Sequence, residues 1–192
     1  MKESVYSAMY GIYSGSYKLL TTAPIAIASA LSAAIVPSII RSITAGDRNT
    51  AIKKIESSMR LTMVVAIPAG MGLSVLGGPI LKLLFRIDPA DMDYAAKIMM
   101  LSVVTVIVFA MSTISNAVLQ GINRMKTPIF NALIGMIIHY IALVAMLIIF
   151  KPNLYAVVIG DIIFGFVVCI LNAISIYRYI GYKQELFKTF LL

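Results

Sequence analysis

The chain has 192 residues, of which 60% are hydrophobic and only 12% charged, with a formal net charge of +8 and a mean hydropathy of +0.95. Soluble domains are about 25% charged, so the composition excludes one large water-soluble core. The positive charge does not indicate a nucleic-acid partner, because Lys and Arg collect in the cytoplasmic loops of membrane proteins. The chain is therefore predicted to lie in a lipid bilayer.

Five apolar stretches are each long enough to cross a membrane. About 20 apolar residues span hydrocarbon about 30 Å thick, since a helix rises about 1.5 Å per residue. The stretches cover residues 19–40, 61–81, 98–122, 127–150 and 154–177. We expect an all-α fold, a single transmembrane domain over residues 1–192 built as a polytopic bundle with about five crossings.

The lead into the first crossing, residues 1–18, is rich in tyrosine: Tyr6, Tyr10, Tyr13 and Tyr17. Tyr prefers the headgroup level of a bilayer, so we expect an interfacial segment. Lys18 follows at the start of the crossing. Its ammonium could meet an anionic lipid headgroup, which makes Lys18 a candidate substrate-binding residue, or it could simply snorkel to the interface.

The connection between the first two crossings contains an amphipathic segment, residues 47–60. Ile52, Ile55 and Met59 share one helical face, and basic residues fill much of the rest. We expect a short helix on the cytoplasmic surface with its charges toward anionic headgroups. A solvated basic loop is the alternative.

The second crossing contains Pro68, Gly70 and Gly72 within six residues of sequence. Proline removes one backbone hydrogen bond and clashes with the preceding turn, so a kink or broken helix is expected there. These three residues are our predicted hinge.

Polar side chains recur on one face of each of the last three crossings. Polar groups are costly in hydrocarbon, so they should face protein or a water-filled cavity. The faces hold Ser112, Ser115, Asn116 and Gln120; Asn131, Gly135, His139 and Ala142; and Asp161, Gly165, Cys169 and Asn172. They indicate either a polar interior, with Asn116 and Asn172 as candidate substrate contacts, or ordinary interhelical hydrogen bonding.

Asp161 is the strongest single functional candidate. It lies about 10 Å below the outer end of its predicted helix, where a carboxylate must be protonated, paired or exposed to a water-filled pathway. His139 lies near the middle of the preceding crossing, and a His–Asp pair would suit a proton or cation site. A structural or vestibule role for Asp161 is the alternative.

Neither catalysis nor a cofactor is expected from the motifs. We find no metal-ligand cluster, no phosphate-binding glycine loop and no nucleophile beside a base in the sequence. Asp88, Asp91 and Asp93 lie close together but lack the glycine and terminal Glu of a calcium loop, so we interpret them as a solvated acidic loop.

Charge counting predicts the orientation. The two sides of a five-crossing arrangement hold six bases against four acids and ten bases against three, which leaves net charges of +2 and +7. By the positive-inside rule the N-terminus is outside and the C-terminus cytoplasmic. The turns 124–126 and 151–153 are short enough to make the last three crossings antiparallel neighbours.

Several stretches, taken in order, resemble a known family. They are Tyr10-Gly11 with Gly15 and Lys18, residues 30–38, Ala45-Gly46-Asp47, Met59-Arg60-Leu61, residues 67–70, residues 78–81, Leu119-Gln120-Gly121 and residues 131–135. This order resembles the polysaccharide-biosynthesis flippases, especially the stage V sporulation protein B and lipid II flippase branch of the multidrug/oligosaccharidyl-lipid/polysaccharide exporter superfamily. The resemblance covers nearly the whole chain.

The resemblance implies a MATE-like architecture of twelve to fourteen crossings in two six-helix lobes around a central cavity. It implies alternating access that moves lipid-linked sugar precursors across the bacterial cytoplasmic membrane. The five helices resemble the eighth through twelfth, part of the C-terminal lobe. Lys18 matches the basic residue that lipid II flippases carry near the outer start of the first of these helices, whereas Asp161 matches no family motif.

The leading interpretation is a partial flippase for peptidoglycan or polysaccharide precursors, incomplete on its own. The implied partners are membrane lipids, an undecaprenyl-linked sugar precursor and a missing N-terminal lobe or partner chain. One alternative is a cation-coupled multidrug exporter of the same superfamily, in which Asp161 and His139 exchange protons or sodium. Another is a non-transporting membrane scaffold or gene remnant.

Overall fold

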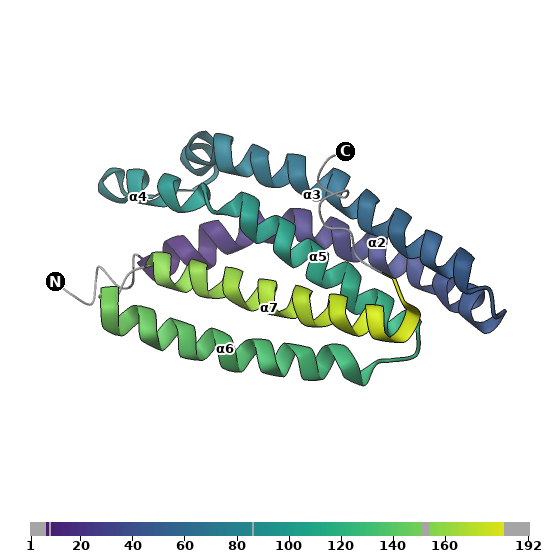
Figure 1. The fold of residues 1–192 in the computed structure, drawn as a ribbon. Coiled ribbons are helices and arrows are strands. Elements are labelled where there is room, and N and C mark those ends of the chain that lie inside the picture. The colour runs from purple at the N-terminus through teal and green to yellow at the C-terminus, as the bar shows by residue number, and fades with distance from the viewer. Residues whose placement is uncertain (1–6, 8, 86, 151–153, 183–192) are drawn as a thin grey trace.

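The computed structural model describes residue 7 and residues 9–85, 87–150 and 154–182, so the predicted turn 151–153 and Tyr6 lie outside the described residues. The elements are η1 (Ile12–Tyr17), α2 (Lys18–Thr44), α3 (Arg48–Leu84), α4 (Pro89–Met99), α5 (Ser102–Gly121), α6 (Lys126–Phe150) and α7 (Leu154–Ile180). Every regular element in this part of the chain is helical, which confirms the all-α prediction. Figure 1 shows the long helices lying side by side in an elongated bundle.

Five helical segments are long and apolar enough to cross a membrane. They are Met9–Thr44, Arg48–Leu84, Ser102–Gly121, Lys126–Ile149 and Leu154–Ile180. The predicted transmembrane helix bundle with five crossings is confirmed on length and composition.

The helix α3 differs from the sequence expectation, because it joins the amphipathic segment 47–60 and the second crossing in one helix of 37 residues. At a rise of about 1.5 Å per residue it is about 55 Å long, so it exceeds the hydrocarbon thickness of about 30 Å. Ile55 and Met59 are buried, so the apolar face of this half packs on protein rather than on headgroups. Asp47 caps the helix by accepting a hydrogen bond from Thr50 N at 2.9 Å, which lowers the pKa of the Asp47 carboxyl.

The predicted third crossing, 98–122, is also different in the structure. Met100 and Leu101 lie in a turn that separates the short helix α4 from α5. Asp88 caps α4 by accepting a hydrogen bond from Ala90 N at 2.9 Å, and Pro89 opens the helix, as its fixed φ favours. The expected acidic loop is therefore largely the beginning of a helix.

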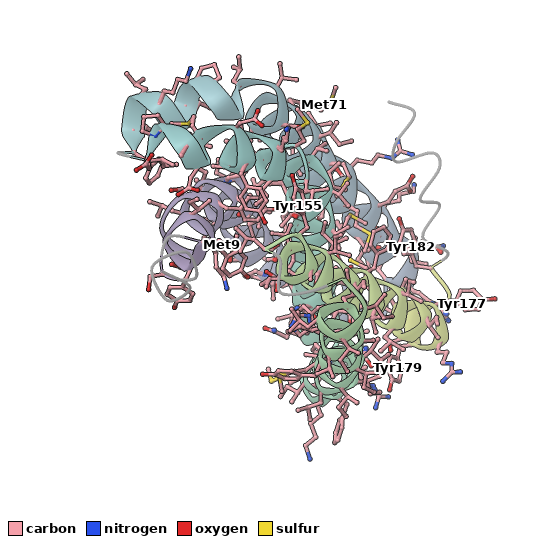
Figure 2. The ribbon with its side chains drawn as sticks, turned by 90° about the vertical axis from the view of Figure 1, so that its left-hand side faces the viewer. Met9, Met71, Tyr155, Tyr177, Tyr179 and Tyr182 are labelled. Carbon is pink, nitrogen blue, oxygen red and sulfur yellow. The ribbon has the colours of Figure 1, made fainter. Side chains whose placement is uncertain are left out.

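The helix α5 is the centre of the bundle. It packs against α2, α3 and α7, whereas α6 lies at the edge and packs mainly on α7. In the most apolar 18-residue segment of each helix, 67% is buried inside the structure for α5 and only 6% for α6. Figure 2 shows the same order from the end of the bundle, with α6 beyond α7 on one side and α3 and α4 on the other. α6 is thus free to face lipid or further helices.

Small residues bring α2, α3 and α5 together in the middle of the bundle. Ala28, Ala66 and Ala110 are buried there beside Val106. A Cβ on Gly70 would lie 3.0 Å from the Val103 Cα of α5, so the two backbones approach closely. Small residues at such contacts let membrane helices pack closely, which matters because the hydrophobic effect does not drive helices together in lipid.

Candidate functional site

The first group of predicted site residues lies where η1, α2 and α7 meet. The Tyr13 hydroxyl donates a hydrogen bond to Asp161 Oδ2. Lys18 Nζ lies 5.4 Å from the centre of the Tyr13 ring, within the range of a cation–π contact. Tyr13 therefore connects Lys18 and Asp161, two residues that the sequence suggested separately.

The same group extends to the central helix through a second tyrosine. The rings of Tyr13 and Tyr17 stack with centroids 6.3 Å apart, and the Tyr17 hydroxyl shares a hydrogen bond of 2.6 Å with Thr105 Oγ1. Tyr17 is buried, so its ring packs on protein, and its interfacial depth stays a prediction. The sequence signal for these contacts was the spacing of four residues between Tyr13 and Tyr17, which places both side chains on one helical face.

His139 lies against a different side of α7. A Cβ on Gly160 would lie 3.1 Å from His139 Cε1 and 3.2 Å from His139 Nδ1, so the imidazole packs on the Gly160 backbone. His139 Nδ1 is buried and has no hydrogen-bond partner among the described residues. Consecutive helical residues point in directions about 100° apart, and the Asp161 carboxylate is bonded to Tyr13. His139 therefore lies beside the residue that precedes Asp161, but no hydrogen bond or ion pair joins His139 to Asp161 among the described residues, and the His–Asp pair stays a prediction.

Three asparagines join α5, α6 and α7. Asn131 Nδ2 donates to Asn172 Oδ1 at 2.8 Å, and Asn172 Nδ2 donates to Asn116 Oδ1 at 2.7 Å. Asn131 also donates to Ser175 Oγ at 3.3 Å. Asn172 is fully buried. The predicted polar faces therefore meet, and at this depth they do so by interhelical hydrogen bonding.

A groove of about 570 Å³ lies between α5 and α6. Asn116 and Gln120 line it from α5. The rest of the wall consists of Met125, Pro128, Ile129, Ala132, Leu133, Met136 and Phe164. Asn116 is therefore at once a member of the asparagine network and accessible from the groove.

The predicted hinge lies on another helix. α3 runs as one helix through Pro68, Gly70 and Gly72. Gly70 faces α5, whereas a Cβ on Gly72 would meet nothing within 4 Å. The hinge remains a prediction, and of its two glycines only Gly70 is required by packing.

The described residues contain no group of three or more His, Cys, Asp or Glu side chains that could hold a metal ion. At one end of the bundle, Lys18 and Asp161 both contact Tyr13. Further along the bundle, the asparagine network lies beside the mostly apolar groove between α5 and α6. Asp161 and Asn172 are about 16 Å apart along α7 at the helical rise. These features suit binding of an amphipathic molecule better than chemistry on it.

Comparison with known proteins agrees with this description. The family model described as Lipid II flippase MurJ matches residues 4–192. The Lipid II flippase MurJ of Bacillus subtilis (strain 168) is 24% identical over 189 residues, which cover 96% of this chain and 34% of that protein. The chain thus spans about a third of the length of the curated relative it matches. No solved structure gave a significant match.

Proposed function

Because this chain belongs to the lipid II flippase MurJ family, we propose that it forms part of the path by which a lipid-linked peptidoglycan precursor crosses the bacterial cytoplasmic membrane. The observation that carries the proposal is the family match over residues 4–192. The five membrane-length helices support it. The proposed activity is transport by alternating access, which leaves the covalent bonds of the substrate unchanged.

In this proposal Lys18 meets the anionic headgroup. It is exposed, and an ammonium is a compact charge with three donors for phosphate oxygens. The Tyr13 ring lies between Lys18 and the Asp161 region. The Tyr13 hydroxyl donates to the Asp161 carboxylate, which lowers the charge density on its oxygens and so weakens, without removing, its repulsion of an approaching phosphate.

Asn116, Asn172 and His139 take secondary roles in the proposed path. Asn116 lines the groove between α5 and α6, where an amide can contact polar parts of a bound lipid. Asn172 holds Asn116 through its hydrogen bond of 2.7 Å. His139 Nδ1 is buried against Gly160 and has no partner among the described residues, so in this proposal it would reach a substrate only when α6 and α7 move apart during alternating access.

The proposed orientation has the Lys18 end outside and the Arg178 end in the cytoplasm, supported by the charge difference between the two sides. Five helices do not enclose a two-lobe cavity. We therefore propose that transport requires a further helical lobe, in the same or a separate polypeptide. The match to 34% of the relative's length supports this.

Photo-crosslinking in membranes tests the binding step. With a photoactivatable lipid II analogue, we expect crosslinks near Lys18, a loss of labelling in Lys18→Gln and retention in Lys18→Arg. Equal labelling by a photoactivatable phosphatidylcholine would contradict a specific lipid II site.

Reconstitution tests the requirement for a second lobe. Proteoliposomes containing the chain alone should not move fluorescent lipid II between leaflets. Addition of the remaining helices of the family fold should restore movement in the wild type more than in Lys18→Gln. Transport of lipid II by the chain alone would contradict the need for a further lobe. Export of cationic drugs that depends on Asp161, without lipid II movement, would instead favour the exporter alternative.

A further inference from the structure

The end of the bundle opposite Asp161 contains a second cavity, of about 250 Å³. α2, α5 and α7 end toward this side and α3 and α6 begin there (Figure 1). Along α7, Asp161 and Ile180 are separated by about 28 Å at the helical rise, close to the thickness of bilayer hydrocarbon. The cavity therefore belongs to the other membrane face and is separate from the group around Lys18.

The wall of this cavity combines two guanidinium groups with apolar side chains. The lining residues are Ile43, Gly46, Arg48, Ala51, Ile122, Arg124, Tyr179 and Ile180. None of these described lining residues is acidic. A basic floor beside an aliphatic wall fits a ligand that carries a negative group next to an apolar part.

Arg48 is held in place by one of its five donors. Its Nε donates a hydrogen bond to the Ile180 carbonyl oxygen at 2.9 Å, where the end of α7 carries partial negative charge. Gly181 follows with φ of +67°. A Cβ on Gly181 would lie 2.9 Å from Arg48 Nη2, so the glycine gives the guanidinium its space. Among the described residues the other donors of Arg48 make no recorded hydrogen bond, so a ligand in the cavity could take them.

Arg124 approaches the cavity from the link between α5 and α6. Its guanidinium carbon lies 4.4 Å from the centre of the Tyr179 ring, within the range of a cation–π contact. The ion pairs among the described residues are Arg60–Glu56 and Lys97–Asp93. Neither Arg48 nor Arg124 is therefore neutralised by a carboxylate in this part of the chain. The nearby Asp47 is engaged with Thr50 N.

We propose that this cavity binds the phosphate of an anionic phospholipid from the adjacent leaflet, with Arg48 and Arg124 as the phosphate ligands. Guanidinium groups match phosphate oxygens in a bidentate manner, and basic pockets between membrane helices bind lipid headgroups. The aliphatic wall favours a phospholipid over free phosphate, because it can take the glycerol and the first acyl carbons. Since Arg48 belongs to α3 and Arg124 to the α5–α6 link, the lipid would hold these helices together at this end.

Lipid retention by the purified full chain tests the proposal. In native mass spectrometry from a zwitterionic detergent, we expect phosphatidylglycerol to be retained and phosphatidylcholine to be lost. Arg124→Gln should lower the affinity for phosphatidylglycerol about tenfold. The matched control is Arg178→Gln, which removes the same charge from an exposed residue at the same end that does not line the cavity, and it should leave the affinity unchanged.

Two further measurements separate the possible ligands and guard against misfolding. Arg48→Lys keeps the charge and a donor for Ile180 but loses the planar fork, so it should retain helicity by circular dichroism while weakening lipid binding. Millimolar inorganic phosphate should not displace the lipid. An equal loss in Arg178→Gln would mean diffuse surface attraction, and full displacement by phosphate would mean a free-anion site. Either result would overturn the proposal without bearing on lipid II transport.

Discussion

Tyr13 donates its hydroxyl hydrogen to the carboxylate of Asp161, a residue 148 positions away in the sequence. The bond gives a carboxylate in a membrane helix a neutral donor, so part of the cost of placing Asp161 there is offset without a counter-ion. Lys18 contacts the ring of the same tyrosine. A single aromatic side chain thus contacts both Lys18 and Asp161, two residues that the sequence suggested separately.

Removal of the Tyr13 hydroxyl should destabilise the protein. Tyr13→Phe keeps the ring and its stacking on Tyr17 but leaves the partly buried Asp161 carboxylate without its donor. We expect a loss of about 1–3 kcal/mol in the free energy of unfolding, measured by thermal unfolding in detergent. Tyr10→Phe is the control, because Tyr10 is 70% exposed. Equal effects of the two substitutions would contradict a structural role for the bond.

The asparagine network should contribute to the free energy of unfolding because its hydrogen bonds connect three helices. Asn172→Leu is close in shape but removes the two side-chain hydrogen bonds that Asn172 makes, one to Asn131 of α6 and one to Asn116 of α5. Interhelical hydrogen bonds in membranes contribute about 0.6 kcal/mol on average and up to about 1.7, so the loss should be about 1–3 kcal/mol.

A double-mutant cycle tests whether the asparagines act together. Asn131→Ala and Asn172→Leu should be less destabilising together than the sum of their separate effects, because they share a bond. Strict additivity of the two unfolding free energies would argue against the network.

Much of the fold was predictable because the apolar runs themselves determine it. Each apolar run is about as long as a bilayer crossing requires or longer. The polar residues that recur at helical spacing, among them Asn116 and Asn172, correctly indicated which helix faces meet. The family resemblance was likewise carried by short stretches spread over the chain, and the family match confirms it.

Other features depend on tertiary contacts that no local pattern contains. No residue between Arg48 and the second crossing breaks a helix. The sequence therefore contains no sign that the amphipathic segment and the crossing form one helix. Met100 and Leu101 are apolar like their neighbours, which hid the turn before α5. The partner of Asp161 was missed because composition alone cannot distinguish an interfacial tyrosine from Tyr13, which turns toward another helix.

The two glycines of the predicted hinge should respond differently to the same substitution. Gly70→Ala would bring a Cβ to 3.0 Å from the Val103 backbone and force α3 away from α5, at a cost of about 1–3 kcal/mol in unfolding free energy. Gly72→Ala faces open space and should stabilise the helix by up to about 1 kcal/mol. Thermal unfolding distinguishes the two, and lipid II transport with the complete set of helices then tests flexibility. Reduced transport in a stable Gly72→Ala variant would support the hinge, whereas unchanged transport would argue against Gly72 as a hinge residue.

The glycine after α7 should link stability to the second cavity. Gly181 adopts φ of +67°, a left-handed conformation that costs other residues about 1–2 kcal/mol. Gly181→Ala also places a Cβ 2.9 Å from Arg48 Nη2, which should push the guanidinium away from the Ile180 carbonyl. We therefore expect both a lower unfolding temperature and weaker retention of phosphatidylglycerol. The control is Gly181→Asn, which places the same Cβ beside Arg48 Nη2 but tolerates the left-handed backbone better than alanine does. It should be more stable than Gly181→Ala while losing as much phosphatidylglycerol, whereas full lipid retention in Gly181→Asn would show that backbone strain, and not the position of Arg48, controls binding.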